Sequence, residues 1–153
     1  MKLILPAAVV GGLTVALVAG CSAPGLYKKR SDLVSNPAAC GAKRFEVYFD
    51  QDQARLTSAA REAIGLTATQ LQGCDVTKVQ VLGLADARSG TAASNQSLSE
   101  RRARSVAEAL ASAGLPAPAF EVAAAGADGA VVNGVNDPLR RRTEVVIEAK
   151  PRR

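Results

Sequence analysis

The sequence contains no histidine, and only 3% of its 153 residues are aromatic. Histidine is the commonest general base and metal ligand near neutral pH, so its absence argues against hydrolase triads and zinc sites. The sequence also shows no paired carboxylates and no nucleophile elbow. We therefore expect no enzyme activity and no metal or other cofactor. The few aromatic rings leave the core to aliphatic residues and cannot form a platform that stacks nucleic-acid bases.

Charge and length limit the kinds of partner and the number of domains. The net charge of +5 permits an acidic polymer or an anionic surface as a partner, but it does not select nucleic acid, and we expect no nucleic-acid partner. A chain of this length, with 48% hydrophobic and 22% charged residues, has room for one globular domain and a leader.

Residues 1–20 have the features of a secretory signal peptide. A positive Lys2 precedes the apolar run Leu3–Val18, and small residues lead up to Cys21. A transmembrane anchor is the alternative, because the longer uncharged run Leu3–Ala23 is nominally long enough to span a bilayer. One proline and three glycines within the run weaken such a helix.

The segment Leu17–Cys21 resembles a bacterial lipobox, in which the cysteine receives a diacylglycerol before the signal peptide is removed. The resemblance implies that Cys21 is the lipidated N-terminus and that it holds the protein on a membrane. Ser22 stands where an aspartate would favour the inner membrane, so we expect the outer membrane. Residues 21–39 would then form a lipidated N-terminus and a flexible linker, because they contain two prolines, a basic triplet and no periodicity.

Cys40 and Cys74 remain once Cys21 is lipidated. In an exported protein, an even pair of cysteines suggests a disulfide, here between residues before the first predicted strand and after the first predicted helix. The alternative is two free thiols. Closing this loop would stabilise the fold by roughly 3–4 kcal/mol in the chain-entropy model.

Residues 40–153 are predicted to form the folded domain. Alternating apolar side chains predict strands over 43–49, 78–83 and 143–148, and a further strand is predicted over 120–124. Helical spacing predicts helices over 57–72, capped by Thr57, and over 99–113. The order βαβαββ indicates an α/β fold, an α+β sandwich in which both helices pack on one face of a sheet. We expect 125–139 to be a loop.

The segment Gly83–Val106 violates a local rule under this assignment. It places Arg101, Arg102 and Arg104 at the start of a helix, where the partial positive charge of the helix dipole disfavours cations. Such conflicts are typical of functional sites. One acid, Asp86, lies in the preceding loop.

Four segments resemble the OmpA-like C-terminal domain, which is also found in the peptidoglycan-associated lipoprotein and in flagellar motor stators. The similarity covers residues 43–149. The segments are VYFD at Val47–Asp50, GLAD at Gly83–Asp86, NQSLSERRARSV at Asn95–Val106 and RRRTEVVI at Arg140–Ile147. The resemblance implies an OmpA-like fold with a mixed four-stranded sheet. It also implies noncovalent binding of peptidoglycan through the diaminopimelate of the stem peptide.

The resemblance assigns roles to individual residues. Asp86 would bind the ammonium of diaminopimelate, and Arg102 would bind the neighbouring carboxylate through its fork of donors. Amide groups near Ser99, at the expected helix start, would add donors to the same carboxylate. Asn95 would order the loop or donate to the ligand. Further candidates are Asp50, at the end of the adjacent strand, and Arg141 or Arg142, as a second carboxylate contact.

Structural roles are the alternatives for these charges. Asp86 and Arg102 could form a plain ion pair, and Arg140–Arg142 could be a charged strand start. The sequence also departs from the family pattern, because Leu84 stands where histidine is usual and the loop before Asn95 is about one residue longer.

The sequence thus predicts a lipid-anchored protein of the outer membrane, facing the periplasm, that tethers the membrane to peptidoglycan. The alternative function is a protein-interaction module that contacts other envelope proteins through the linker and residues 125–139, without binding the wall.

Overall fold

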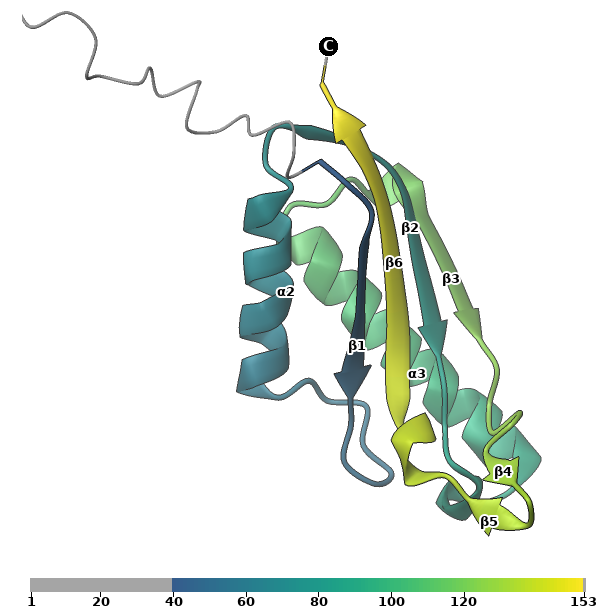
Figure 1. Ribbon diagram of the computed structural model, residues 1–153. Coiled ribbons are helices and arrows are strands. Elements are labelled where there is room, and N and C mark those ends of the chain that lie inside the picture. The colour runs from purple at the N-terminus through teal and green to yellow at the C-terminus, as the bar shows by residue number, and fades with distance from the viewer. Residues whose placement is uncertain (1–39, 153) are drawn as a thin grey trace, which may run out of the picture.

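A mixed four-stranded sheet is the framework of the structure, a computed structural model that describes residues 40–152 (Figure 1). The predicted signal peptide, the lipidation site Cys21 and the linker lie outside the described residues. The strands follow the spatial order β1-β6-β2-β3, in which β1 and β2 run antiparallel to β6, and β3 runs parallel to β2. Their bounds are β1 Lys43–Tyr48, β2 Cys74–Gly83, β3 Phe120–Ala124 and β6 Arg142–Pro151. The predicted α+β fold is confirmed.

Two helices cover one face of this sheet, α2 (Ser58–Gln70) and α3 (Ala92–Ser112). Thr57 caps α2 as predicted, because its side chain accepts a hydrogen bond from the backbone amide of Ala60 at 3.1 Å. The core is aliphatic, as the shortage of aromatics requires, and it joins the inner faces of the strands to both helices. Its fully buried members include Val79, Val81, Val145, Ile147, Ile64, Val106 and Leu110. No helix among residues 40–152 is both long enough and apolar enough to cross a membrane.

The start of α3 differs from the prediction. The helix begins at Ala92 rather than Ser99, and its cap is Thr91, which accepts a hydrogen bond from the Ser94 amide. Serine and asparagine have low helix propensity, which is why the first two turns resemble a loop in the sequence. The arginines Arg101, Arg102 and Arg104 therefore lie in the middle of the helix, and the predicted conflict with the helix dipole does not exist.

Two strands are longer than predicted. β2 begins at Cys74 instead of residue 78, and β6 continues to Pro151 instead of ending at residue 148, so that Lys150 and Pro151 pair with the start of β2. A register irregularity between Val76 and Lys78 interrupts the side-chain alternation, which hides this part of the strand in the sequence.

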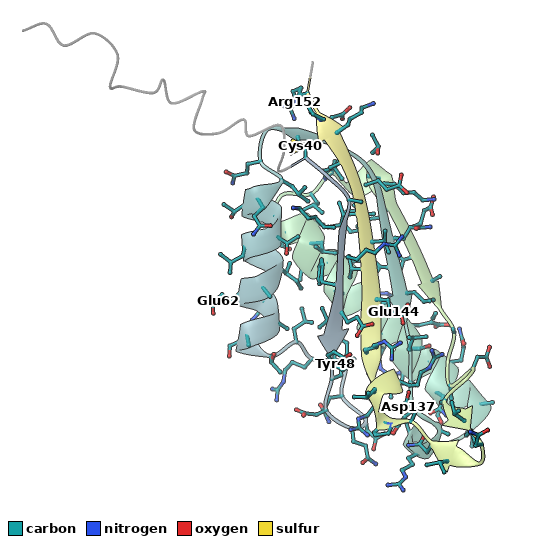
Figure 2. The ribbon with its side chains drawn as sticks, in the orientation of Figure 1. Cys40, Tyr48, Glu62, Asp137, Glu144 and Arg152 are labelled. Carbon is teal, nitrogen blue, oxygen red and sulfur yellow. A yellow bond between two sulfur atoms is a disulfide. The ribbon has the colours of Figure 1, made fainter. Side chains whose placement is uncertain are left out.

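The predicted disulfide is present. Cys40 and Cys74 are joined with a Cα–Cα distance of 5.5 Å. The bond fixes the chain just before β1 to the start of β2, near the C-terminal end of β6, where Figure 2 shows Cys40 beside Arg152.

Residues 125–139 are more ordered than the predicted loop. They contain a hairpin made of β4 (Val131–Val132) and β5 (Val135–Asn136), followed by the 3-10 turn η4 (Pro138–Arg140). Asn133 and Gly134 both have positive φ, at 52° and 78°, which is the conformation of a two-residue hairpin turn. The short 3-10 turns η2 (Ala87–Ser89) and η3 (Ala117–Ala119) complete the elements.

Candidate binding site

A buried acid lies where β2 leaves the sheet. Asp86 has no exposed surface, and three side chains donate to its carboxylate. Ser89 Oγ donates to Oδ1 at 2.6 Å, while Arg141 Nη1 and Asn136 Nδ2 donate to Oδ2 at 3.1 and 3.4 Å. Burial acts to raise the pKa of Asp86, but these hydrogen bonds outweigh it and hold the pKa below its ordinary value. Asp86 is therefore a carboxylate at neutral pH.

Arg102 is the only one of the three α3 arginines that is buried, and it also has no exposed surface. Its Nε, Nη1 and Nη2 atoms donate to the carbonyls of Gln53, Leu84 and Asp50 at 2.8, 2.9 and 3.1 Å. Its guanidinium carbon lies 5.2 Å from the centre of the Phe49 ring. A guanidinium has five N–H groups, so two of them are not used by these bonds.

The electrostatic state of Arg102 follows from the same surroundings. Burial lowers its pKa, and the negative charge of Asp86 opposes that effect. The side chain nevertheless stays cationic, because arginine titrates far above neutral pH. By contrast, Arg101 is exposed and donates only to Ser97 Oγ at 2.7 Å, so it has no part in this site.

The structure separates the two candidates for a second cation. Arg141 forms the ion pair with Asp86 at 3.1 Å, whereas no direct ion pair joins Asp86 to Arg102 among the described residues. Arg142 projects to the other face of the sheet, where it pairs with Glu144 at 2.6 Å and Glu46 at 3.3 Å. Burial acts to lower the pKa of Arg142, but these acids raise it above its ordinary value. The site therefore contains Arg141, and Arg142 lies apart from it.

Asn95 and Asp50 border the site in different ways. Asn95 is 3% exposed and lies on the same face of α3 as Arg102, about two turns before it. Its Nδ2 donates to the Gly90 carbonyl at 3.4 Å, while its Oδ1 has no partner. Asp50 is exposed and contributes its backbone carbonyl to Arg102 rather than its carboxylate.

Ser99 differs from its expected role as a free amide at a helix start, because it lies within α3. Its hydroxyl donates to the Gln96 carbonyl at 2.8 Å and accepts from the Gly126 amide at 3.0 Å. Ser99 therefore links α3 to the loop after β3. Its carbonyl would lie 1.9 Å from a Cβ placed at Gly83, so only glycine allows β2 and α3 to approach this closely.

Two side chains of the site were not predicted. Ser89 and Asn136 both bond to Asp86, and Asn136 Oδ1 also accepts from the Ala87 amide at 2.8 Å. The Asn-Gly pair at 133–134, flanked by valines, is a hairpin signal that would have predicted β4 and β5. Nothing in the sequence connects Asn136 with an acid 50 residues earlier.

These residues form a charged cluster with one acid, Asp86, and two guanidinium groups, Arg102 and Arg141. The cluster has a net charge of +1 and suits a ligand that offers both an ammonium and a carboxylate. Among the described residues, no group of histidine, cysteine, aspartate and glutamate is placed to hold a metal ion.

Comparison with known proteins identifies the family of this chain. The model of the OmpA family matches residues 48–144, which include all of the charged cluster. The chain belongs to the OmpA family. Outer membrane protein A from Shigella flexneri is 31% identical over 137 residues, which are 88% of this chain and 36% of that relative. The outer-membrane lipoprotein YfiB of Pseudomonas aeruginosa is 33% identical over 108 residues, which are 69% of this chain and 64% of that relative.

Solved structures of the OmpA family share the fold. The peptidoglycan-associated lipoprotein from Burkholderia pseudomallei is 26% identical with a TM-score of 0.59, over 69% of this chain and 91% of that one. The OmpA-like domain of FopA1 from Francisella tularensis has a TM-score of 0.60 at 24% identity, over 72% of this chain and 73% of that one. This OmpA-family chain spans about a third of the length of the Shigella relative, so the similarity concerns one domain of that protein. The relatives named here are outer-membrane proteins and lipoproteins rather than enzymes.

Proposed function

We propose that this domain binds peptidoglycan noncovalently through the diaminopimelate of the stem peptide. The observation that carries the proposal is the buried Asp86 carboxylate with Arg102 and Arg141 beside it, at the exit of β2 in an OmpA-family domain. The free end of diaminopimelate carries an ammonium and a carboxylate on one carbon. Asp86 binds the ammonium, and the guanidinium groups bind the carboxylate, Arg102 through the N–H groups that the backbone carbonyls leave free.

The relatives support a place in the cell envelope. Their names include an outer-membrane lipoprotein and a peptidoglycan-associated lipoprotein. We propose the same location for this chain, with Cys21 lipidated, the outer membrane as its membrane and the periplasm as the compartment of the domain. Replacing Cys21 by serine should leave an uncleaved precursor without lipid, as measured by mass spectrometry of the N-terminus. A mature wild-type chain without lipid on Cys21 would contradict the anchor.

The arrangement of the two ends of the sheet supports a tether. The described chain begins at Cys40, which is bonded to the first residue of β2, whereas Asp86 follows the last residue of β2. The ten residues of β2 span about 31 Å at the rise of an antiparallel strand. The chain arriving from a lipid would enter at one end of the domain, and the wall would be bound at the other (Figure 1).

Binding to isolated sacculi tests the proposal. The full chain, purified in detergent, should sediment with sacculi that contain diaminopimelate. The variant Asp86→Asn, which keeps the size of the side chain but removes its charge, should stay in the supernatant. Asp128→Asn is the matched control, because Asp128 is an exposed acid in the neighbouring loop and should not affect binding. The proposal fails if the wild-type chain does not sediment, or if both variants sediment equally.

An apolar surface on the hairpin favours a second candidate function. Val131, Val132, Val135 and Leu139 are all exposed, by 53–68%, and they lie within nine residues of the chain. Clustered exposed aliphatic side chains are typical of contacts between proteins. The domain would then join an envelope assembly through the hairpin. Crosslinking from Val135 that captures the same envelope protein in wild type and in Asp86→Asn would favour this function over wall binding.

A further inference from the structure

The carboxamide of Asn136 bridges two groups at the charged cluster. Its nitrogen donates to Asp86 Oδ2 at 3.4 Å, and its oxygen accepts from the Ala87 amide at 2.8 Å. Asn136 comes from β5, in the hairpin, and its neighbour Asp137 is labelled at the lower end of the molecule in Figure 2. One planar group thus pairs at the same time with a carboxylate and with the next backbone N–H along the chain.

We propose that Asn136 is an internal stand-in for the amino-acid end of the ligand and that the ligand takes its place. This inference rests on the proposed function. The carboxamide presents a donor to Asp86 and an acceptor to Ala87 N–H. An ammonium and a carboxylate on one carbon present the same pair, so the ammonium replaces Nδ2 on Asp86 and the carboxylate replaces Oδ1 on Ala87 N–H.

Burial requires such an exchange. Asp86 has no exposed surface, so no ligand reaches its carboxylate unless a covering group leaves. The Asn136 bond is the longest of the three on Asp86, at 3.4 Å compared with 2.6 Å for Ser89 and 3.1 Å for Arg141. A neutral amide donor is also weaker than an ammonium on a carboxylate. Asn136 is therefore the group that a ligand displaces at least cost.

The hairpin is suited to withdraw the Asn136 side chain from Asp86. β4 and β5 pair only with each other and with no strand of the four-stranded sheet. The closing pair of the hairpin, Val132 and Val135, is 58% and 68% exposed. Moving this closing pair therefore exposes little additional apolar surface.

The exchange also determines selectivity. A ligand with an ammonium alone, such as a lysine side chain, would pair with Asp86 but leave Ala87 N–H without the partner that Asn136 supplied. An unpaired donor in a site closed to water is costly. The Nε of Arg141, a buried donor without a partner, lies on the side chain that already binds Asp86 and adds a second donor for the carboxylate. The ligand class is thus a free amino-acid end.

Titration of the full chain in detergent with free meso-diaminopimelate tests the exchange. Asn136→Ala removes the internal competitor and should bind about three- to tenfold more tightly than wild type, since modest hydrogen bonds no longer have to be broken. Val132→Thr, on the same hairpin but directed away from the cluster, is the matched control and should bind like wild type. Lysine whose α-amino and α-carboxyl groups are both blocked as amides carries an ammonium with no carboxylate beside it, and it should bind neither protein measurably.

Hydrogen exchange at the Ala87 amide gives an independent measurement. The amide should be protected in wild type, exposed in Asn136→Ala, and protected again when diaminopimelate is added to the variant. Circular dichroism should confirm that the variant is folded, and wild-type protection should persist in the complex.

The outcomes distinguish this inference from the proposed function. A wild-type chain that binds no diaminopimelate refutes the proposed function, and this inference with it. If wild type binds and Asn136→Ala binds equally or more weakly, only the exchange is refuted. Diaminopimelate that leaves the Ala87 amide of the variant unprotected also refutes the exchange.

Discussion

Replacing Arg102 by methionine tests how the charged cluster is held together. The buried Leu84 carbonyl would lose its only described side-chain donor, which costs about 1–3 kcal/mol. The carbonyls of Asp50 and Gln53 belong to exposed residues and can be rehydrated, at about 0.5 kcal/mol each. Loss of the contact with Phe49 adds about 0.5–1 kcal/mol.

Together these terms predict that Arg102→Met lowers the free energy of unfolding by about 3 kcal/mol, a large share of the roughly 5–15 kcal/mol typical of a domain. Urea unfolding followed by far-ultraviolet circular dichroism measures the loss. Arg101→Met is the matched control, because the exposed Arg101 bonds only to Ser97, and it should change stability by less than about 0.5 kcal/mol. A loss below about 1 kcal/mol for Arg102→Met would refute the structural role of the three carbonyl bonds.

Three further predictions concern the scaffold and pH. Replacing Cys40 and Cys74 by alanine should lower the free energy of unfolding by roughly 3–4 kcal/mol, and adding reductant to the wild-type chain should have the same effect in urea titrations. Gly83→Ala should destabilise the domain by at least about 1–3 kcal/mol, because the new Cβ meets the Ser99 carbonyl. Ala42→Gly, at an exposed position before β1, is the control and should destabilise the domain less. The lowered folded-state pKa of Asp86 contributes stability that is present above about pH 4, its usual range, and is lost as the pH falls through the folded-state pKa. Asp86→Asn should therefore show a weaker acid dependence of the unfolding free energy below pH 4 than wild type, and equal slopes would contradict that assignment.

Local chemistry allowed much of the fold to be predicted from the sequence. The alternation in β1, the Thr57 cap and the helical spacing of α2 depend on neighbours in the chain, and all of them are present. The predicted start of α3 was wrong because Ser94, Asn95 and Ser97 have low intrinsic helix propensity. The Thr91 cap and the burial of Asn95 overcome that low propensity.

The site was harder to predict, because its geometry depends on contacts between distant segments. The resemblance placed Asp86 and Arg102 in one site, and they lie close together, but each has other direct partners. Arg102 bonds to carbonyls at the exits of β1 and β2, and Asp86 bonds to Arg141 and Asn136, which follow it by at least 50 residues. No sequence pattern encodes such pairing. The choice of Arg141 over Arg142 depends on the pleat of β6, which sends the Arg142 side chain to the other face of the sheet.

The central claim is that the cluster around Asp86 binds an amino-acid end, with both its ammonium and its carboxylate. Sedimentation with two kinds of sacculi tests it most directly, one with diaminopimelate and one with lysine at the same position of the stem peptide. The two side chains differ only in the carboxylate beside the terminal ammonium. The wild-type chain should sediment with the diaminopimelate sacculi and remain in the supernatant with the lysine sacculi. Equal sedimentation with both would contradict the claim.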